Sequence, residues 1–325
     1  MGWTPQPGML GAAHKPGAMP LRPLGLGDIY DAAFRIIRFN PRATVGSAVL
    51  VTGAAMAIPI VVTAILTGLV DLSLDQSDGN VSTAETIGYI GAFGSLGLGT
   101  VLQSIGLLFV TGMVAHVTAA AAIGRRLSLG EAWAATRGSR WRLVGLSLLL
   151  ALIGLGIVLL YAAAWVVVVL ALPLVAIVLF GVVTVPAVLA LLSWLWIRVF
   201  YLPVPALMVE RTRVPGAIGR GWALTRRQFW RTFGIALLTA LITQIAASLL
   251  AVPFSIGAQV IPLAFPDSRF TVLVFVVLQS LGTVVSSAFV APFTAAVTSL
   301  QYLDQRMRKE AYDVELMAQA GITAR

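Results

Sequence analysis

The feature that most constrains this sequence is the length of its uncharged stretches. No formally charged side chain occurs between Leu143 and Ile197, and residues 43–70 and 86–124 are also uncharged. About 20 apolar residues are enough to cross the hydrocarbon core of a bilayer as an α-helix. Only 11% of the residues are charged, whereas a soluble domain has roughly 25%. These values exclude a soluble globular enzyme and predict an all-α integral membrane protein.

The charges that flank each apolar run limit how often it can cross the membrane. Residues 86–124 lie between Glu85 and Arg125. Flanks of opposite sign require an odd number of crossings, and the run is too short for three. Residues 143–197 have arginines on both sides, which requires two crossings with a turn near Pro173. The proline-rich stretch 253–269 divides the last region. The predicted crossings, within a six-helix domain of residues 26–303, are 43–70, 92–124, 143–171, 174–197, 232–253 and 270–300.

The distribution of charge predicts the orientation in the membrane. Six crossings place both termini on one side, and all 22 basic residues except Arg269 fall on that side. The loops on the other side hold acidic residues, and this asymmetry is typical of a cytoplasmic basic face. The preference for Arg over Lys suggests a bacterial genome rich in GC. We therefore expect a multi-pass protein of the bacterial inner (cell) membrane with cytoplasmic termini, a flexible N-terminal arm at 1–25 and a charged tail at 304–325.

Three inner segments have a similar layout. Gly27, Gly130 and Gly216 each precede a short stretch rich in Arg, which is followed by two crossings. This pattern predicts an internal repeat of three transmembrane hairpins, each preceded by a short interfacial amphipathic helix. In the first unit the acidic residues precede the arginines, and Asn40-Pro41 ends the helix. In the second, Ser128 and Glu131 have the spacing of a capping box.

Basic helices with nearby tryptophans lie flat on bilayers. They either cover the inner face of the bundle, which is the simpler interpretation, or they recognise anionic lipid head groups. Anionic lipid is a closer partner for these arginines than nucleic acid, because they adjoin apolar runs. The candidate head-group contacts on the inner face are Arg35, Arg38, Arg42, Arg137, Arg140, Arg220, Arg227 and Arg231.

The C-terminal tail is the most highly charged segment. Its spacing of opposite charges at i and i+4 predicts a helix that continues from the sixth crossing, with the pairs 304–308, 306–310 and 309–313. The tail is either a solvated helix or the partner of arginines on the interfacial helices. The candidate ion-pairing residues are Asp304, Arg306, Arg308, Glu310, Asp313 and Glu315.

Groups that could carry chemistry are scarce in the crossings. The chain has no cysteine, which excludes thiolate nucleophiles and cysteine metal sites, and no zinc-protease or serine-hydrolase motif is present. Among the interior polar residues we select Gln103 and His116 as intramembrane candidates, the latter as a hydrogen bonder between helices. Gly91, Ser95 and Gly99 predict close helix packing rather than a flexible gate. We expect no catalytic residue, no cofactor and no metal.

Three segments suggest a family. They are 22–35 (RPLGLGDIYDAAFR), 223–231 (ALTRRQFWR) and 302–315 (YLDQRMRKEAYDVE). They resemble bacterial multi-pass proteins described as the glycerophosphoryl diester phosphodiesterase membrane domain. The resemblance extends from about Arg22 to Met317 and implies a membrane module. The family name comes from fusions to a catalytic domain, for which the inner loops of this chain are too short.

Two functions remain open from the sequence. The first is a non-catalytic inner-membrane protein that interacts with lipid and acts as a scaffold or partner subunit of an envelope-associated complex. It follows from the basic, Trp-containing inner face. The alternative is a transporter or flippase-like carrier of a lipid or other amphiphile, which follows from the repeat and the Gly-rich second crossing.

Overall fold

The computed structural model describes residues 17–72, 82–319 and 321, and no strand occurs among them. Most of the expected N-terminal arm (1–16) and Asp75 and Asp78 of the acidic loop lie outside these residues. The elements are α1 (Leu26–Phe39), α2 (Pro41–Leu69), α3 (Thr83–Ala122), α4 (Leu129–Ala135), α5 (Arg140–Ala171), α6 (Leu174–Leu195), the π-helix η2 (Trp196–Tyr201), α7 (Pro203–Glu210), α8 (Val214–Thr225), α9 (Phe229–Ala264), α10 (Thr271–Glu310) and α11 (Tyr312–Gln319).

Within the described part of the chain, six helical stretches are long and apolar enough to cross a membrane. They are α2, α3, α5, the continuous stretch Leu174–Glu210, α9 and α10. This confirms the prediction of an all-α protein with six spans. Each pair of spans follows a short helix (α1, α4 or α8) in the chain. The similarity of the three units as a repeat stays a prediction.

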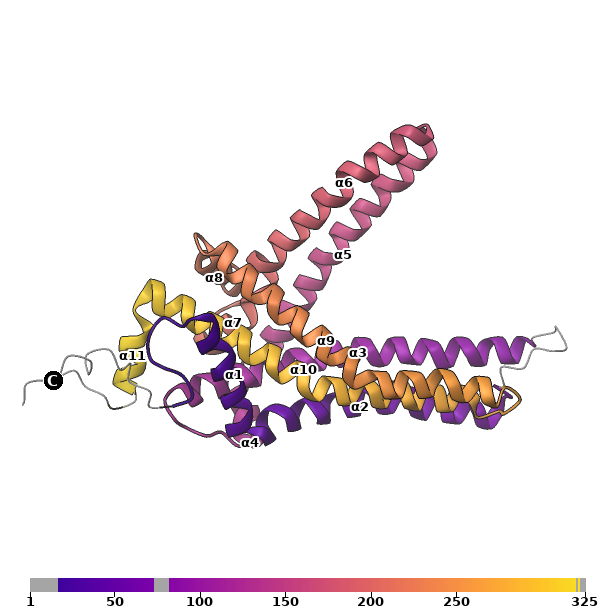
Figure 1. Cartoon of the computed structure of the whole chain (residues 1–325), viewed down its shortest axis with the longest axis horizontal. Helices are drawn as coiled ribbons and strands as arrows, with labels where there is room; N and C mark the ends of the chain where they lie inside the picture. Colours follow the sequence, from indigo (N-terminus) through magenta and orange to yellow (C-terminus); the bar gives the residue numbers. More distant parts are fainter. Residues whose placement is uncertain (1–16, 73–81, 320, 322–325) are drawn as a thin grey trace, which may run out of the picture.

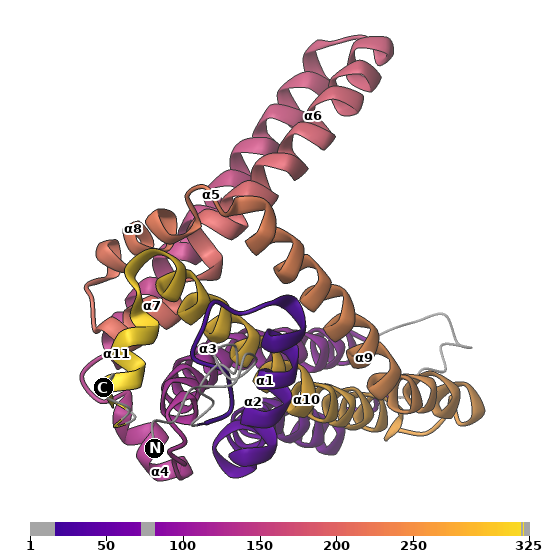
Figure 2. The same cartoon turned by 60° about the vertical axis from the view of Figure 1, so that its left-hand side comes forward.

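The spans form two parts of different character (Figure 1). α2, α3, α9 and α10 run together as a bundle, while the α5–α6 hairpin diverges from it in both views (Figures 1 and 2). No residue in the most apolar stretch of the span Leu174–Glu210 is buried inside the protein. The hairpin is held together along its own length, by a hydrogen bond of 3.1 Å between Tyr161 and Thr184 and by the rings of Trp165 and Phe180.

Small residues bring α2 and α3 into close contact. A Cβ atom added at Gly91 would lie 2.8 Å from Leu66 Cδ1, and one at Gly99 would lie 3.1 Å from Pro59. Ser95, between these two glycines on the same face, is buried. The packing interpretation of this small-residue stripe is therefore confirmed, because side chains of α2 fill the space that larger residues would need.

Several crossings extend beyond the predicted bounds, α3 and α9 among them. α3 begins at Thr83 rather than near 92, and its Ser82–Glu85 capping box defines the start. α9 continues through Pro253 to Ala264, although we expected it to end at 253. Proline is tolerated in membrane helices because neighbouring helices, Ser or Thr side chains and ordered waters satisfy the carbonyl that it leaves unpaired. The polar residues after Phe265 make the turn instead.

The segments at the inner side also differ from the predicted layout. We use "inner end" for the end of the bundle that carries α1, α4, α8 and α11 (Figure 1). Residues 17–25 are not a flexible arm, since Met19 and Leu24 are fully buried in the core. The third basic stretch is divided: α8 ends at Thr225, Arg227 lies in the turn with a positive φ, and Arg231 belongs to α9. The chain also forms an additional buried helix, α7.

Other local predictions are confirmed. α1 ends at Asn40 and Pro41 is the first residue of α2, because proline fits only the first turn of a helix without cost. Ser128 and Glu131 form the expected capping box. The turn between α5 and α6 is at Pro173. At the end of the bundle opposite the inner end, the guanidinium of Arg269 donates to the Thr67 carbonyl near the end of α2 at 2.8 Å.

The six-span topology predicts where single cysteines can be labelled. The natural chain has none, so each variant carries one site. Pro266→Cys, in the exposed α9–α10 turn, should react with a membrane-impermeant maleimide from one side of sealed vesicles. Gly130→Cys and Gln319→Cys should react only from the other side. Labelling of all three from the same side would contradict this topology.

Candidate functional site

A buried carboxylate organises the inner end of the bundle. Asp304 of α10 is fully buried. It accepts hydrogen bonds from the backbone N–H of Leu24 at 2.7 Å, from Arg308 Nε at 3.0 Å and from Arg231 Nη1. Because an unpaired buried charge is costly, the two guanidinium groups compensate the charge of this carboxylate inside the protein. We call Asp304, Arg231, Arg308 and the Leu24 backbone the Asp304 cluster.

The same two arginines also hold the Leu24 carbonyl. Arg231 Nη2 donates to it at 2.6 Å and Arg308 Nη2 at 2.9 Å. Both polar groups of the Leu24 peptide backbone are thus satisfied by the cluster. The contacts join the segment before α1, the start of α9 and the end of α10, which are far apart in the sequence.

A second group of charges lies beside the first, and we call it the Glu210 cluster: Glu210, Arg220, Tyr302, Arg306 and Glu310. Arg220 bridges Glu210 at 2.9 Å and Glu310 at 2.6 Å, while Tyr302 Oη donates to Glu210. Burial would lower the pKa of the Arg220 guanidinium, but its hydrogen bonds to the carboxylates of Glu210 and Glu310 outweigh burial and raise its pKa. The cluster joins α7, α8 and α10.

The contacts in these two clusters show which of the ion pairs predicted for the charged tail form. The pairs 304–308 and 306–310 form, and Asp304 and Glu310 also bind arginines of α9 and α8. The tail does not begin at 304, because α10 continues to Glu310 and buries Asp304. Lys309 does not extend the i,i+4 series to Asp313. It donates to the carbonyls of Ala223 and Arg226 at the end of α8 instead. Asp313 and Glu315 lie on the separate helix α11.

The arginines proposed as head-group contacts fall into three groups. Arg220 and Arg231 are occupied by carboxylates within the protein, so their assignment to lipid is corrected. Arg140 lies over the Trp133 ring and donates to the Trp133 carbonyl. The remaining members are exposed to the surroundings: Arg35, Arg38, Arg42, Arg137 and Arg227.

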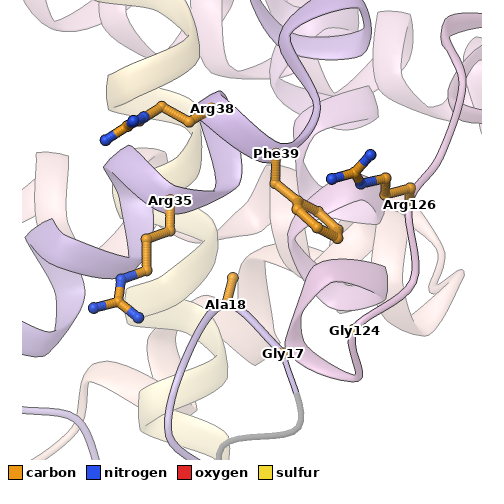
Figure 3. Close-up of a pocket in the computed structure, with 7 residues that line it drawn as sticks. All are labelled: Gly17, Ala18, Arg35, Arg38, Phe39, Gly124 and Arg126. Atoms are coloured by element: carbon orange, nitrogen blue, oxygen red, sulfur yellow. The ribbon is translucent and has the colours of Figure 1, made fainter.

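A pocket of about 430 Å³ is lined by two of these exposed arginines, Arg35 and Arg38, and by a third arginine, Arg126. Figure 3 shows the Phe39 ring of α1 turned toward Arg126, which follows α3, while Arg35 and Arg38 extend from the other side of α1. The Arg126 guanidinium lies 4.1 Å from the centre of the Phe39 ring and Arg35 pairs with Asp31 at 2.9 Å. Among the described residues, neither Arg38 nor Arg126 forms an ion pair with a carboxylate. We call this site the arginine pocket.

A second pocket of about 430 Å³ lies within the membrane-spanning part, between α3, α9 and α10. Three glutamines line it, one from each helix: Gln103, Gln244 and Gln279. Smaller polar side chains complete its polar surface, namely Ser248, Thr283, Ser286 and Ser287. Its lining contains no Asp, Glu, Lys or Arg. We call it the polar pocket.

Of the two intramembrane candidates, only Gln103 belongs to this pocket. Its Nε2 donates to Ser287 Oγ at 2.7 Å and so joins α3 to α10. His116 does not line the pocket, and its Nε2 atom is buried without a hydrogen-bond partner. The prediction that His116 hydrogen-bonds between helices is therefore not met at Nε2.

Sequence reasoning missed several residues of these sites. Glu210 and Arg126 were not selected because no local periodicity marks them, and only the fold brings them to their partners. Gln244 and Gln279 carried a usable signal, since each is an uncharged polar residue in an apolar run. Among the described residues no group of three His, Asp or Glu side chains could hold a metal ion.

Comparison with known proteins gives no family assignment. No family model, curated protein or solved structure matches this chain. The resemblance to the glycerophosphoryl diester phosphodiesterase membrane domain stays a prediction. The inference of function therefore depends on the geometry of the sites.

The Asp304 cluster predicts a large effect of a small substitution. Asp304→Asn keeps the shape of the side chain but removes the charge that compensates Arg231 and Arg308. We expect a loss of about 3 kcal/mol, since breaking a buried ion pair leaves an uncompensated charge. The apparent melting temperature in detergent should fall by roughly 5 °C or more.

Asp313→Asn is the matched control, because Asp313 is only partly buried on α11 and should leave the melting temperature within about 1 °C of the natural protein. Equal melting temperatures for the two variants would contradict the role of the cluster.

Proposed function

We propose that this protein is a non-catalytic, multi-pass protein of the bacterial inner membrane that binds an anionic lipid head group and acts as a scaffold or partner subunit of an envelope-associated complex. Its termini lie in the cytoplasm, and the inner end of the bundle faces that compartment. The observation that carries the proposal is the arginine pocket, which is lined by three arginines from two separate parts of the chain.

The chemistry of the arginine pocket suits a phosphate group. Guanidinium groups bind phosphate oxygens through paired N–H donors, and they stay charged at all physiological pH values. Arg38 and Arg126 are free of carboxylate partners among the described residues, so their donors are available to a ligand. Phe39 supplies an apolar wall beside the charges (Figure 3), as a lipid near the membrane boundary would require.

The scaffold part of the proposal is supported by the α5–α6 hairpin. The two helices contact each other and the base of the bundle, but only 17% and 0% of their most apolar stretches are buried inside the protein. This leaves a long surface available to another membrane-embedded partner. Within a bilayer such packing would depend on van der Waals contact and not on the exclusion of water.

The arginine pocket predicts selective loss of bound lipid. Arg126→Gln and Arg38→Gln should each reduce the amount of phosphatidylglycerol retained in native mass spectra by about fivefold, since one basic residue at an anionic surface contributes about 1 kcal/mol. Arg137→Gln, an exposed arginine outside the pocket, is the matched control and should retain the natural amount.

Inorganic phosphate distinguishes a free anion from a lipid. If the lipid is the ligand, phosphate added at the concentration of the lipid should leave the bound phosphatidylglycerol unchanged. Displacement by phosphate would assign the pocket to a soluble anion. Equal lipid retention in all three variants would contradict the proposal.

A second function, a carrier of a lipid or other amphiphile, is favoured by the polar pocket in the middle of the spans. A carrier must move its ligand as well as bind it. In proteoliposomes the natural protein should then speed the transfer of a fluorescent lipid between leaflets, and Gln279→Leu should abolish the increase. A transfer rate equal to that of protein-free vesicles would contradict the carrier and leave the scaffold proposal standing.

A further inference from the structure

The polar pocket lies where the surroundings are least polar. Gln103 is about midway along α3, between Thr83 and Ala122, and Gln244 is near the middle of α9. These helices cross the region where the hydrocarbon core supplies no hydrogen-bonding partner. A glutamine side chain at this depth therefore needs a partner from the protein, from water or from a bound molecule.

The protein supplies only part of these partners. Gln103 donates to Ser287, but its Oε1 atom has no hydrogen-bond partner among the described residues. Gln244 makes one long contact, 3.5 Å from its Nε2 to Ser248 Oγ. The side-chain amide of Gln279 forms no hydrogen bond within the described chain. Each unsatisfied polar group costs about 1–3 kcal/mol once it is removed from water. The pocket is thus built with spare donors and acceptors.

The walls of the pocket are fixed by close contacts. Ser286 Oγ donates to the Ala247 carbonyl at 3.1 Å, which joins α9 to α10. A Cβ atom added at Gly282 would lie 3.1 Å from Phe254, so the two helices approach closely there. Together with the bond from Gln103 to Ser287, these contacts hold all three helices around the pocket. The pocket therefore does not need to be formed by its ligand.

The lining determines the class of ligand. No charged side chain is available to compensate an ionised head group, which would be costly at this depth. Amide and hydroxyl groups instead match a neutral group that both donates and accepts hydrogen bonds. Gln244 and Ser248 are exposed on α9, so the pocket opens toward the lipid. Leu107 and Val290 add apolar surface to the lining, against which an acyl chain can lie.

We infer that the polar pocket binds the uncharged polar part of a neutral amphiphile, with a free hydroxyl and an ester carbonyl, as in a diacylglycerol. The volume of about 430 Å³ would accommodate a glycerol unit with its ester groups, or roughly 14 water molecules at about 30 Å³ each. The site is distinct from the arginine pocket, since Gln103 is about 28 Å along α3 from its inner end. It supplies the binding step that a carrier would need but does not require movement of the ligand.

The test uses a photoactivatable diacylglycerol in phosphatidylcholine vesicles that contain the full-length protein. Cross-linked peptides are identified by mass spectrometry. We expect labelling concentrated on the pocket-lining parts of α3, α9 and α10, and a decrease of at least about fivefold in Gln279→Leu, as expected for the loss of one or two hydrogen bonds. Gln259→Leu, on α9 outside the pocket, is the matched control and should be labelled like the natural protein.

Three other outcomes would overturn the inference. Labelling spread evenly over the lipid-facing surface, and equal in the two variants, would show that the pocket holds only water. Stronger labelling of the pocket by photoactivatable phosphatidylglycerol than by diacylglycerol would show that it accepts a charged head group. Unchanged pocket labelling in Gln279→Leu would show that the glutamines do not determine the binding of the diacylglycerol. None of these results depends on the arginine pocket, so the head-group proposal stands or falls separately. The melting temperature of each variant shows that a change in labelling is not a loss of fold.

Discussion

The fold depends on the burial of one carboxylate, Asp304, at the inner end of the bundle. A charge in this position is stable only when opposite charges and hydrogen-bond donors surround it. The Asp304 cluster supplies them from three parts of the chain, and in doing so it fixes the segment before α1 against the long helices α9 and α10. An apolar bundle in a membrane gains little from hydrophobic exclusion between its helices, so such polar contacts carry much of the specificity.

α10 is the element on which the inner end is assembled. Its last turns hold Asp304 and Arg308 of the Asp304 cluster, three residues of the Glu210 cluster, and Lys309, which donates to carbonyls at the end of α8. Farther along, the same helix lines the polar pocket with Gln279 and Ser287. One helix thus connects the charged inner face with the neutral pocket in the membrane. The α5–α6 hairpin, by contrast, contributes little to either cluster and diverges from the bundle (Figure 2).

The sequence was sufficient for features governed by local rules. The six spans follow from apolar length, and the turns at Pro41 and Pro173 follow from the geometry of proline. Pro253 was misleading because proline is tolerated inside membrane helices, where neighbouring groups satisfy the carbonyl that it leaves unpaired, and α9 continues through it. The pair Asp304–Arg308 was visible as an i,i+4 spacing, but its burial was not. Burial depends on Leu24 and Arg231, and nothing in the local pattern indicates that the fold brings these residues together.

Hydrogen–deuterium exchange of the natural protein and Asp304→Asn tests the central claim most directly. The Leu24 amide donates to Asp304, so peptides from residues 18–26 and 229–235 should exchange markedly faster in the variant, while α5–α6 peptides keep their natural rates. Unchanged protection at 18–26, with the Asp304 charge removed, would show that the carboxylate does not hold the inner end together.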